Sequence, residues 1–235
     1  MSKNEPTTRS STEIDPTRSD LDNFLADMMA TKKSGVSGTG RLIFALDATM
    51  SREQTWDMAC QLQGDMFKTV ASIGGLNVQL VYYRGLDECR ASRWVTDPVK
   101  LANLMTKIKC NAGHTQIGKV LAHAKRETGL LKVAAAVFVG DAFEEDADEI
   151  VPLARELGQL NMPVFMFQEG DSRSVERVFR EVAKASGGAY CRFDDGSADQ
   201  LRELLKLVAT CAVGGVAALA ASKSADAVKL LSQLR

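Results

Sequence analysis

The sequence predicts an α/β protein with an open, mostly parallel β-sheet, helices on both faces of the sheet and one short antiparallel edge strand. Short apolar runs alternate along the chain with segments of helical periodicity, which is typical of a parallel sheet wrapped by helices. The apolar runs are continuous, as expected of parallel strands that are covered on both faces. A chain of 235 residues also buries enough surface to fold without disulfides or zinc.

Five apolar runs predict the main strands of this sheet, and a shorter segment predicts its edge. The five runs are 42–46, 78–83, 133–139, 163–167 and 189–193, and the edge strand is expected at 93–95. Apolar residues three and four positions apart predict the helices, which are expected around 56–73, 101–108, 117–124, 153–157, 175–182, 201–208 and 228–234. The helix around 153–157 is expected to begin no earlier than Asp148, because Pro152 is tolerated in the first turn of a helix.

The chain also has segments outside the sheet domain. The N-terminal residues are rich in Ser, Thr, Pro and charge, which is typical of a disordered tail, and apolar residues at helical spacing follow them. A Gly-Gly pair interrupts the last long helix, and the segment after it either mediates self-association or covers an edge of the sheet. The predicted parts are a tail at 1–18, a helix at 19–31, a linker at 32–40, the α/β domain at 41–213 and a C-terminal helical extension at 214–235.

The composition argues against several classes of protein. The 29 basic and 30 acidic residues balance, so no net charge favours binding to nucleic acid or to a membrane surface. The five cysteines form no C-x-x-C pair and there are two histidines, which argues against structural zinc and fits a cytoplasmic location. The N-terminus lacks the apolar core of a secretory signal. The apolar run 207–221 is short for a membrane span, so we expect none.

Oxygen-bearing side chains lie at the predicted strand ends where α/β sheets bind ligands. Asp47, Thr49 and Ser51 follow the first strand, Thr115 precedes the helix near 117, and Asp141 follows a fully apolar strand. Ligands of open α/β sheets bind outside the carboxyl ends of the strands, where the strand order reverses. Two carboxylates and three hydroxyls form a set of hard donors that suits Mg²⁺, or Mn²⁺ where it is available.

This set resembles the metal-ion-dependent adhesion site (MIDAS) of von Willebrand factor type A (VWA) domains. The family pattern is Asp-x-Ser-x-Ser after the first strand, then a distant Thr and a second Asp after the fourth strand. The first motif looks like Asp47-x-Thr49-x-Ser51, in which Thr replaces the first Ser and keeps the hydroxyl. Thr115 looks like the family threonine and Asp141 like the second aspartate, and the resemblance covers roughly residues 40–212 in element order.

The resemblance implies a Rossmann-like VWA fold and a protein that is not an enzyme. It implies that the three hydroxyls bind the metal directly and that the two aspartates act partly through water. The expected function is a divalent-metal-dependent protein-binding module of adhesion or scaffold type. The metal would accept a carboxylate from an Asp or Glu of a partner protein. The sequence departs from the family at His114 and Ala142, where glycine is frequent.

Each candidate ligand also has a purely structural interpretation. Ser51 and Gln54 have the spacing of a capping box, and Thr115 stands where it would cap the helix near 117. Asp47 and Asp141 are placed where a carboxylate commonly satisfies amides at a strand end. All five residues fall at the expected loops in the expected order, which favours the metal site.

Two features near Asp141 and Thr115 have less specific interpretations. Histidine suits a site of hard oxygen ligands poorly, so His114 is expected in the loop or at the rim of the site. The acidic run 144–149 is expected to be a solvated face, and the alternative is that it tunes which partner docks.

Two other functions remain alternatives. A haloacid-dehalogenase-like, Mg²⁺-dependent phosphohydrolase would use Asp47 as its nucleophile. Such enzymes need a second Asp two residues on as general acid and base, where this chain has Thr49. The third possibility is a VWA scaffold without metal, whose fold serves protein contacts alone.

Overall fold

The computed structural model describes residues 40–53, 76–193 and 198–234. These residues belong to one compact unit, Val36–Arg235. The predicted N-terminal tail and helix, almost all of the predicted linker and the predicted helix at 56–73 lie outside the described residues.

The described residues form a six-stranded sheet in the order β3-β2-β1-β4-β5-β6, which confirms the predicted fold class. Neighbouring strands are parallel except β2 and β3, which pair antiparallel at one edge. The strands are β1 (Gly40–Asp47), β2 (Leu76–Arg84), β3 (Glu88–Ala91), β4 (Ala135–Gly140), β5 (Val164–Glu169) and β6 (Tyr190–Phe193).

The antiparallel edge strand exists, but its predicted position at 93–95 is wrong. The chain turns back directly after β2, and Gly85 adopts a positive φ of 64° that a side chain would strain. Glu88 therefore pairs with Arg84, and β3 continues to Ala91. Val95 forms only an isolated bridge with Val78. In β3 the charged residues Glu88 and Arg90 alternate with the small residues Cys89 and Ala91, and all four are half-exposed or exposed, so the strand carries no strong apolar signal.

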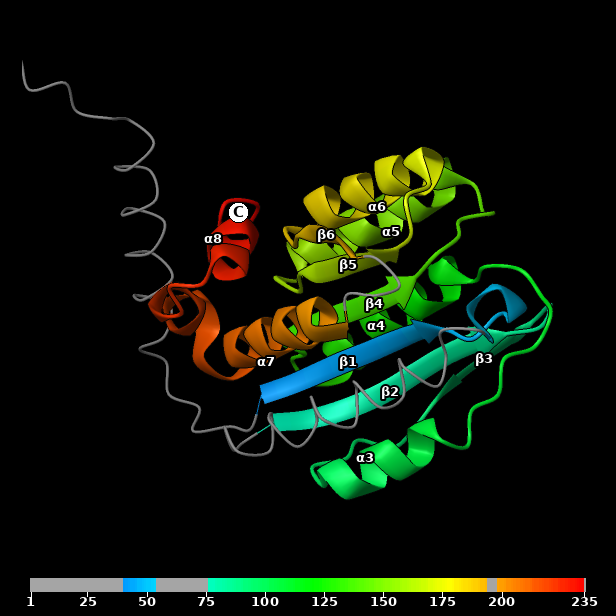
Figure 1. Ribbon diagram of the computed structural model, residues 1–235, viewed down its shortest axis with the longest axis horizontal. Coiled ribbons are helices and arrows are strands. Elements are labelled where there is room, and N and C mark those ends of the chain that lie inside the picture. The colour runs from blue at the N-terminus through cyan, green and yellow to red at the C-terminus, as the bar shows by residue number, and fades with distance from the viewer. Residues whose placement is uncertain (1–39, 54–75, 194–197, 235) are drawn as a thin grey trace, which may run out of the picture. The chain divides into compact units, whose positions relative to one another are not determined.

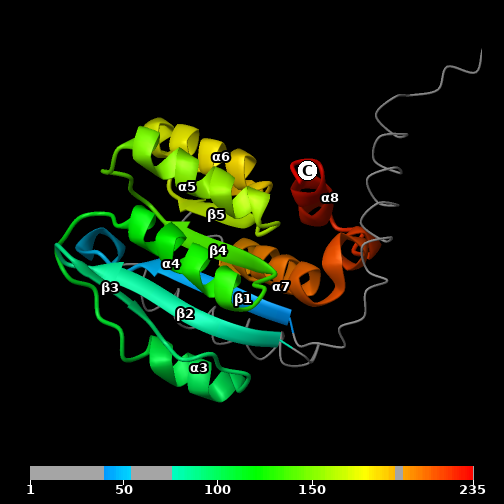
Figure 2. The same cartoon turned by 180° about the vertical axis from the view of Figure 1, so that it is seen from behind.

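Helices cover both faces of the sheet, each over its own apolar cluster. Figure 1 is seen from the side of α7, and Figure 2 from the side of α4 and α5. One face carries α4 (Ile117–Leu130), α5 (Ala147–Gln159) and α6 (Arg173–Ser186). The other face carries α3 (Pro98–Met105), α7 (Ala198–Ala221) and α8 (Ala225–Leu231). Alternate residues of β1 serve the two clusters, since Phe44 belongs to one and Ile43 to the other.

Helix α5 begins one residue before the expected limit at Asp148, so Pro152 lies beyond its first turn. Proline has no N–H, and the carbonyl of Asp148 therefore lacks the usual helical donor. Pro152 is exposed, so this carbonyl can turn toward solvent instead. The side chain of Asp146 caps the helix by accepting from the N–H of Asp148.

Helix α7 is interrupted where the Gly-Gly pair predicted it. Gly215 has non-helical angles, with φ at 71° and ψ at −176°. By length and composition, the segment Asp199–Ala221 is the one described helix that is long and apolar enough to cross a membrane. In the fold, 39% of its most apolar stretch is buried, and Leu204, Leu205 and Val208 lie in the cluster on one face of the sheet.

The strand order reverses at β1. The chain passes from β1 to β2 on one side and later returns to place β4 on the other side. A crevice outside the carboxyl ends of β1 and β4 is the place where this architecture binds ligands. Asp47 is the last residue of β1, and Asp141 is the first residue after β4. The fold thus brings the two predicted aspartates to the ligand-binding end of adjacent strands.

Candidate functional site

Asp47 is fully buried at the end of β1, and both of its carboxylate oxygens accept a hydrogen bond. The backbone N–H of Thr49 donates to Oδ1 at 2.8 Å. The hydroxyl of Tyr83, at the end of β2, donates to Oδ2 at 2.9 Å. Asp47 therefore does accept from an amide at the strand end, as its structural interpretation predicts. The carboxylate is also fixed in orientation from two sides.

The environment of Asp47 disfavours its negative charge. Burial raises the pKa of the Asp47 carboxyl above its ordinary value, and the nearby Asp141 carboxylate raises this pKa further. The hydrogen bonds from Thr49 and Tyr83 lower the pKa, but the net shift is upward. Two carboxylates close enough to repel each other are a site where a cation would be stabilised.

Asp141 supplies the second carboxylate and a buried acceptor. Among the residues that the structure describes, its Oδ1 atom is buried and has no hydrogen-bond partner. A buried acceptor without a partner costs about 1–3 kcal/mol, so native proteins rarely keep one without a reason. A bound cation would satisfy this oxygen. The donor set around Asp141 therefore fits a hard divalent ion.

Thr49 and Ser51 bring two hydroxyls together directly after Asp47. The short 3₁₀ helix η1 (Met50–Arg52) begins after Thr49, and the oxygens Oγ1 of Thr49 and Oγ of Ser51 lie 3.0 Å apart. Thr49 is buried, whereas Ser51 is exposed. Gln54, the other half of the predicted capping box, lies outside the described residues.

Thr115 does not cap α4, so that structural interpretation is wrong. The residue at the N-cap position is Gln116, whose side chain makes no capping bond. The Oγ1 atom of Thr115 instead accepts from the backbone N–H of Glu144 at 2.9 Å. Glu144 lies in the loop that begins with Asp141, so Thr115 is tied to the loop that follows β4.

The sequence predicts a solvated acidic face at residues 144–149; Glu144 is exposed and Glu145 is partly buried, and both also bind backbone groups of the loop before α4 and its first turn. The Glu144 carboxylate accepts from the N–H of Thr115 at 3.0 Å. The Glu145 carboxylate accepts from the N–H groups of Ile117 and Gly118 at 2.6 and 2.8 Å. Asp148 and Glu149 are exposed as expected.

His114 lies in the loop before α4, as predicted, and it contacts the same acidic loop. Its side chain is exposed, and Nδ1 lies 3.3 Å from Oε2 of Glu144. The backbone N–H of His114 donates to the carbonyl of Gly85 at the end of β2. The loop before α4 is thus held by contacts to two strand-end loops.

A buried ion pair beside the candidate ligands was not predicted. The Nε atom of Arg52 lies 2.8 Å from Oε2 of Glu169, and the two side chains are 1% and 7% exposed. Arg52 follows Ser51 directly, and Glu169 is the last residue of β5. The pair therefore connects the loop after β1 to the end of a strand two positions away in the sheet.

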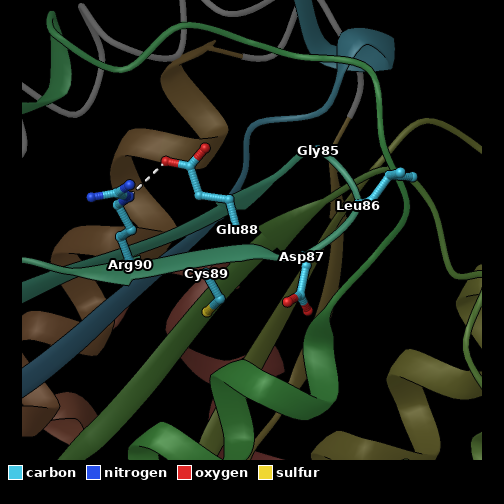
Figure 3. Close-up of a pocket in the computed structure, with 6 residues that line it drawn as sticks. All are labelled: Gly85, Leu86, Asp87, Glu88, Cys89 and Arg90. Atoms are coloured by element: carbon cyan, nitrogen blue, oxygen red, sulfur yellow. Dashed lines mark hydrogen bonds and ion pairs between the residues drawn. The ribbon is translucent and has the colours of Figure 1, made fainter.

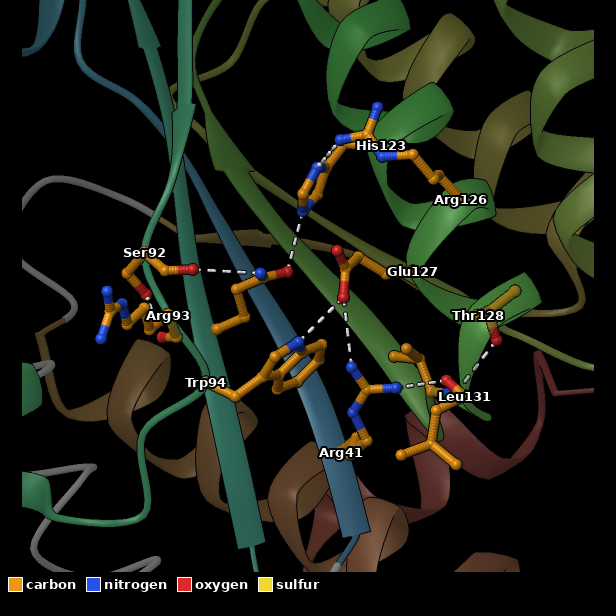
Figure 4. A network of polar contacts seen from close by, with 11 residues as sticks. Arg41, Ser92, Arg93, Trp94, His123, Arg126, Glu127, Thr128 and Leu131 are labelled. Atoms are coloured by element: carbon orange, nitrogen blue, oxygen red, sulfur yellow. Dashed lines mark hydrogen bonds and ion pairs between the residues drawn. The ribbon is translucent and has the colours of Figure 1, made fainter.

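Helix α4 is also held against the sheet by a network of polar contacts (Figure 4). The Glu127 carboxylate accepts from Nε1 of Trp94 at 2.8 Å and from Nη2 of Arg41 at 3.1 Å. The Arg41 guanidinium lies 3.8 Å from the centroid of the Trp94 ring. On the same helix, His123 Nε2 lies 2.8 Å from Oε1 of Gln79 on β2. This network fixes the helix whose N-terminus borders the candidate site.

A hollow of about 510 Å³ lies at the turn between β2 and β3, and Figure 3 shows the six residues 85–90 that line it. Its carboxylates already have cationic partners. Glu88 binds Arg84 and Arg90, and Asp87 binds Lys119. Burial raises the pKa of the Cys89 thiol to about 11, so this thiol is neutral and poorly nucleophilic at pH 7. The hollow contains none of the five predicted ligands.

The candidate site is made mostly of hydroxyls and two aspartates rather than of a dense cluster of acids. Among the described residues, no group of three or more His, Cys, Asp or Glu side chains is placed to hold a metal ion. Any cation at the β1 and β4 ends would therefore depend on the threonine and serine oxygens. The five predicted ligands remain a prediction.

Comparisons with known proteins support the fold and leave the function open. No family model matches the chain, and no curated protein matches it in sequence. A solved structure of a von Willebrand factor type A protein from Catenulispora acidiphila matches 74% of this chain with a TM-score of 0.61 at 16% identity. The match covers 43% of that protein, so the chain spans less than half of its length.

Two further solved structures show the same fold. The VWA domain of SpRpn10 matches 72% of this chain and 95% of its own length, with a TM-score of 0.56 at 11% identity. The pilus adhesin SpaC from Lactobacillus rhamnosus GG matches 76% of this chain and 31% of its own, with a TM-score of 0.60 at 8% identity. The fold is therefore a VWA fold, and at such low identity the likeness carries no more than the fold.

Proposed function

We propose that this chain is a protein-binding module that depends on a divalent cation, Mg²⁺ or Mn²⁺, and that is not an enzyme. The observation that carries the proposal is the buried Oδ1 atom of Asp141, which has no hydrogen-bond partner among the described residues. It lies beside Asp47, whose pKa is raised chiefly by burial and further by Asp141. A cation between these carboxylates would compensate both unfavourable features.

The roles of the site residues follow from their chemistry. The hydroxyls of Thr49, Ser51 and Thr115 would bind the ion, and Asp47 and Asp141 would neutralise its charge. When bound, the ion supplies a coordination position that takes a carboxylate from an Asp or Glu of a partner protein. Hard oxygen ligands and an open position suit Mg²⁺. The chain itself fixes Asp47 through Thr49 and Tyr83.

The comparisons support a binding role by analogy. One similar structure is the pilus adhesin SpaC, and another is the VWA domain of SpRpn10. Cys89 and Cys191 are free thiols, which fits the proposed cytoplasmic location.

The geometry of Asp47 favours binding over phosphoryl transfer. A nucleophilic carboxylate needs an accessible oxygen, whereas both oxygens of Asp47 accept hydrogen bonds and the residue is fully buried. The position for a second catalytic Asp is Thr49, which has no proton to exchange near neutral pH.

Affinity capture in the presence of Mg²⁺ and of EDTA tests the proposal. Immobilised chain is incubated with extract, and the recovered proteins are compared between the two conditions and with an Asp47→Ala variant. We expect partners that require Mg²⁺ and that Asp47→Ala fails to recover. Recovery of the same partners by wild type in EDTA as in Mg²⁺, or by Asp47→Ala as by wild type in Mg²⁺, would contradict a cation-dependent site. Hydrolysis of a phosphomonoester that Asp47→Asn abolishes would favour the phosphohydrolase instead.

A further inference from the structure

The loop after β4 holds the loop before α4 through two consecutive carboxylates. Both oxygens of Glu145 accept backbone N–H groups in the first turn of α4, from Ile117 and Gly118. Gly118 permits this approach, because a Cβ atom at that position would lie 3.2 Å from Oε1 of Glu145 and 2.9 Å from Cδ1 of Ile150. The helix N-terminus is thus capped from another loop.

Glu144 and Thr115 bind each other in both directions. The N–H of Thr115 donates to the Glu144 carboxylate at 3.0 Å, and the N–H of Glu144 donates to Oγ1 of Thr115 at 2.9 Å. Thr115 is 3% exposed, so its hydroxyl cannot exchange this partner for bulk water. The N–H of Glu144 occupies one lone pair of the hydroxyl oxygen, and a second lone pair is left for a cation. The position and rotamer of Thr115 are therefore set by Glu144.

We propose that Glu144 and Glu145 are positioning residues of the divalent-cation site. They fasten the loop that carries Thr115 to the loop that begins with Asp141, so these two ligands hold a constant separation whether or not the ion is bound. This inference rests on the proposed function, because it assigns the carboxylates a role toward the same ion. Neither glutamate is a ligand in this assignment, since Glu144 accepts the N–H of Thr115 and Glu145 accepts two N–H groups of α4.

A positioning role differs from a merely structural role in what it changes. Loss of a structural contact lowers the melting temperature and leaves the affinity of the folded protein for the ion unchanged. Loss of a positioning contact also lowers the affinity for the ion, because Thr115 is then no longer held in place and must be ordered when the ion binds. Contacts that orient metal ligands typically contribute 10-fold to 100-fold to metal affinity.

The test compares three glutamate variants with a control of matched charge. Glu144→Ala removes the acceptor for the Thr115 N–H, Glu144→Gln keeps a carbonyl acceptor, and Glu145→Gln keeps one acceptor of two. Glu149→Gln is the control, because Glu149 belongs to the same acidic run and is exposed in the first turn of α5. For each protein, Mg²⁺ affinity is measured by calorimetry, and the melting temperature and amide hydrogen exchange are measured in EDTA.

We expect Glu144→Ala to weaken Mg²⁺ binding by about 10-fold or more. In EDTA, the amide of Thr115 should exchange faster in this variant, and Glu145→Gln should accelerate exchange at Ile117 or Gly118. Glu144→Gln should recover part of the affinity, and it serves as the folded variant if the alanine protein does not fold. Glu149→Gln should bind within about twofold of wild type.

Wild-type affinity in Glu144→Ala and in Glu144→Gln would overturn the inference, as would a lower melting temperature with no change in affinity. In either case wild type still binds Mg²⁺, so the proposed function survives the failure of the positioning role. A wild-type chain that binds neither Mg²⁺ nor Mn²⁺ would overturn the proposed function and this inference together.

Discussion

At the scale of single residues, Asp47 carries a conflict between stability and function. The carboxylate is fully buried, and burial and Asp141 raise its pKa. A carboxyl with a raised pKa in the folded state binds its proton more tightly there than in the unfolded chain. Its ionised form therefore reduces the stability of the metal-free protein near neutral pH. Native residues that destabilise in this way are expected at functional sites.

Asp47→Asn is predicted to stabilise the metal-free protein at neutral pH. The amide removes the buried charge and keeps an oxygen for the N–H of Thr49. We expect the melting temperature in EDTA to rise by about 2–4 °C, which corresponds to roughly 1 kcal/mol. The advantage should shrink as pH falls through the raised pKa of Asp47, because wild type then gains a proton and loses the unfavourable charge. Thermal melts of both proteins at a series of pH values between about 4 and 8 measure the difference. A variant less stable than wild type at every pH contradicts the assignment of strain to Asp47.

Tyr83→Phe is predicted to destabilise the chain in a pH-dependent manner. It removes the hydroxyl that donates to Oδ2 of Asp47 and leaves a buried carboxylate oxygen without that donor. We expect a loss of about 1–3 kcal/mol in urea unfolding at neutral pH, which decreases once Asp47 is protonated. Tyr190→Phe is a matched control, because the Tyr190 hydroxyl donates to the neutral amide oxygen of Gln168. The same pH dependence in both variants would show that Asp47 is not the cause.

The Arg52–Glu169 pair predicts non-additive substitutions. Removal of one partner takes a counterion away from a buried charge, which typically costs about 3–5 kcal/mol. We expect Arg52→Met and Glu169→Gln each to destabilise strongly, and the double variant to be more stable than the sum of the two losses predicts. A double-mutant cycle in urea measures this coupling. Strict additivity would mean that each side chain acts through other contacts.

At the scale of elements, the C-terminal segment after α8 closes the edge strand β6. The side-chain amide of Gln233 accepts from the N–H of Tyr190 at 2.9 Å and donates to the carbonyl of Tyr190 at 3.1 Å. This pair of bonds is the one that a neighbouring strand would make. Of the two expectations for the C-terminal extension, the structure thus supports coverage of an edge. Exposed edges promote pairing between chains, and natural proteins cover them.

Gln233→Ala is predicted to open this edge. We expect a loss of about 1–2 kcal/mol in urea unfolding, because two backbone groups of Tyr190 lose their partner. Self-association measured by sedimentation velocity should increase with concentration. Ser232→Ala is the neighbouring control, since the Ser232 hydroxyl donates to the carbonyl of Lys229, one turn earlier in the chain, and not to β6. An unchanged sedimentation profile for Gln233→Ala would mean that α8 itself protects the edge.

The sequence predicts the elements whose burial follows from residue type. The run VAAAVFV at 133–139 predicts β4 because its side chains have no alternative to the core. The edge strand β3 lies earlier in the chain than the sequence predicts, because an edge strand needs no apolar pattern. The start of α5 was predicted too late because proline was expected in the first turn. Pro152 is tolerated further inside the helix, since the carbonyl that lacks its N–H partner lies on the exposed side.

Contacts between distant residues are what the sequence could not predict at the candidate site. Asp47, Thr49, Ser51 and Asp141 follow strands, so their place at the sheet edge comes directly from the strand pattern. The partners of Glu144 and Glu145 are amides about thirty residues earlier in the chain, which no local pattern encodes. The density of charge along the sequence indicates a solvated run, but it does not show which N–H groups the carboxylates accept from.

At the scale of the whole molecule, a bound ion should stabilise the fold through mass action. A ligand that binds only the folded state adds about 2.7 kcal/mol at a free concentration one hundred times its Kd. For a domain of this size that corresponds to a rise of roughly 5–10 °C in melting temperature. The rise should occur with Mg²⁺ or Mn²⁺ and be reversed by EDTA.

The thermal shift also separates the cation site from general effects of salt. Asp47→Asn should lose the shift while its melting temperature in EDTA rises, so the two measurements move in opposite directions. If the shift came only from the screening of surface charges by salt, it would be the same in wild type and in Asp47→Asn. A matched titration with NaCl at equal ionic strength completes the comparison. If millimolar Mg²⁺ and Mn²⁺ leave the wild-type melting temperature unchanged, the chain has no such cation site, and the fold serves as a metal-free scaffold.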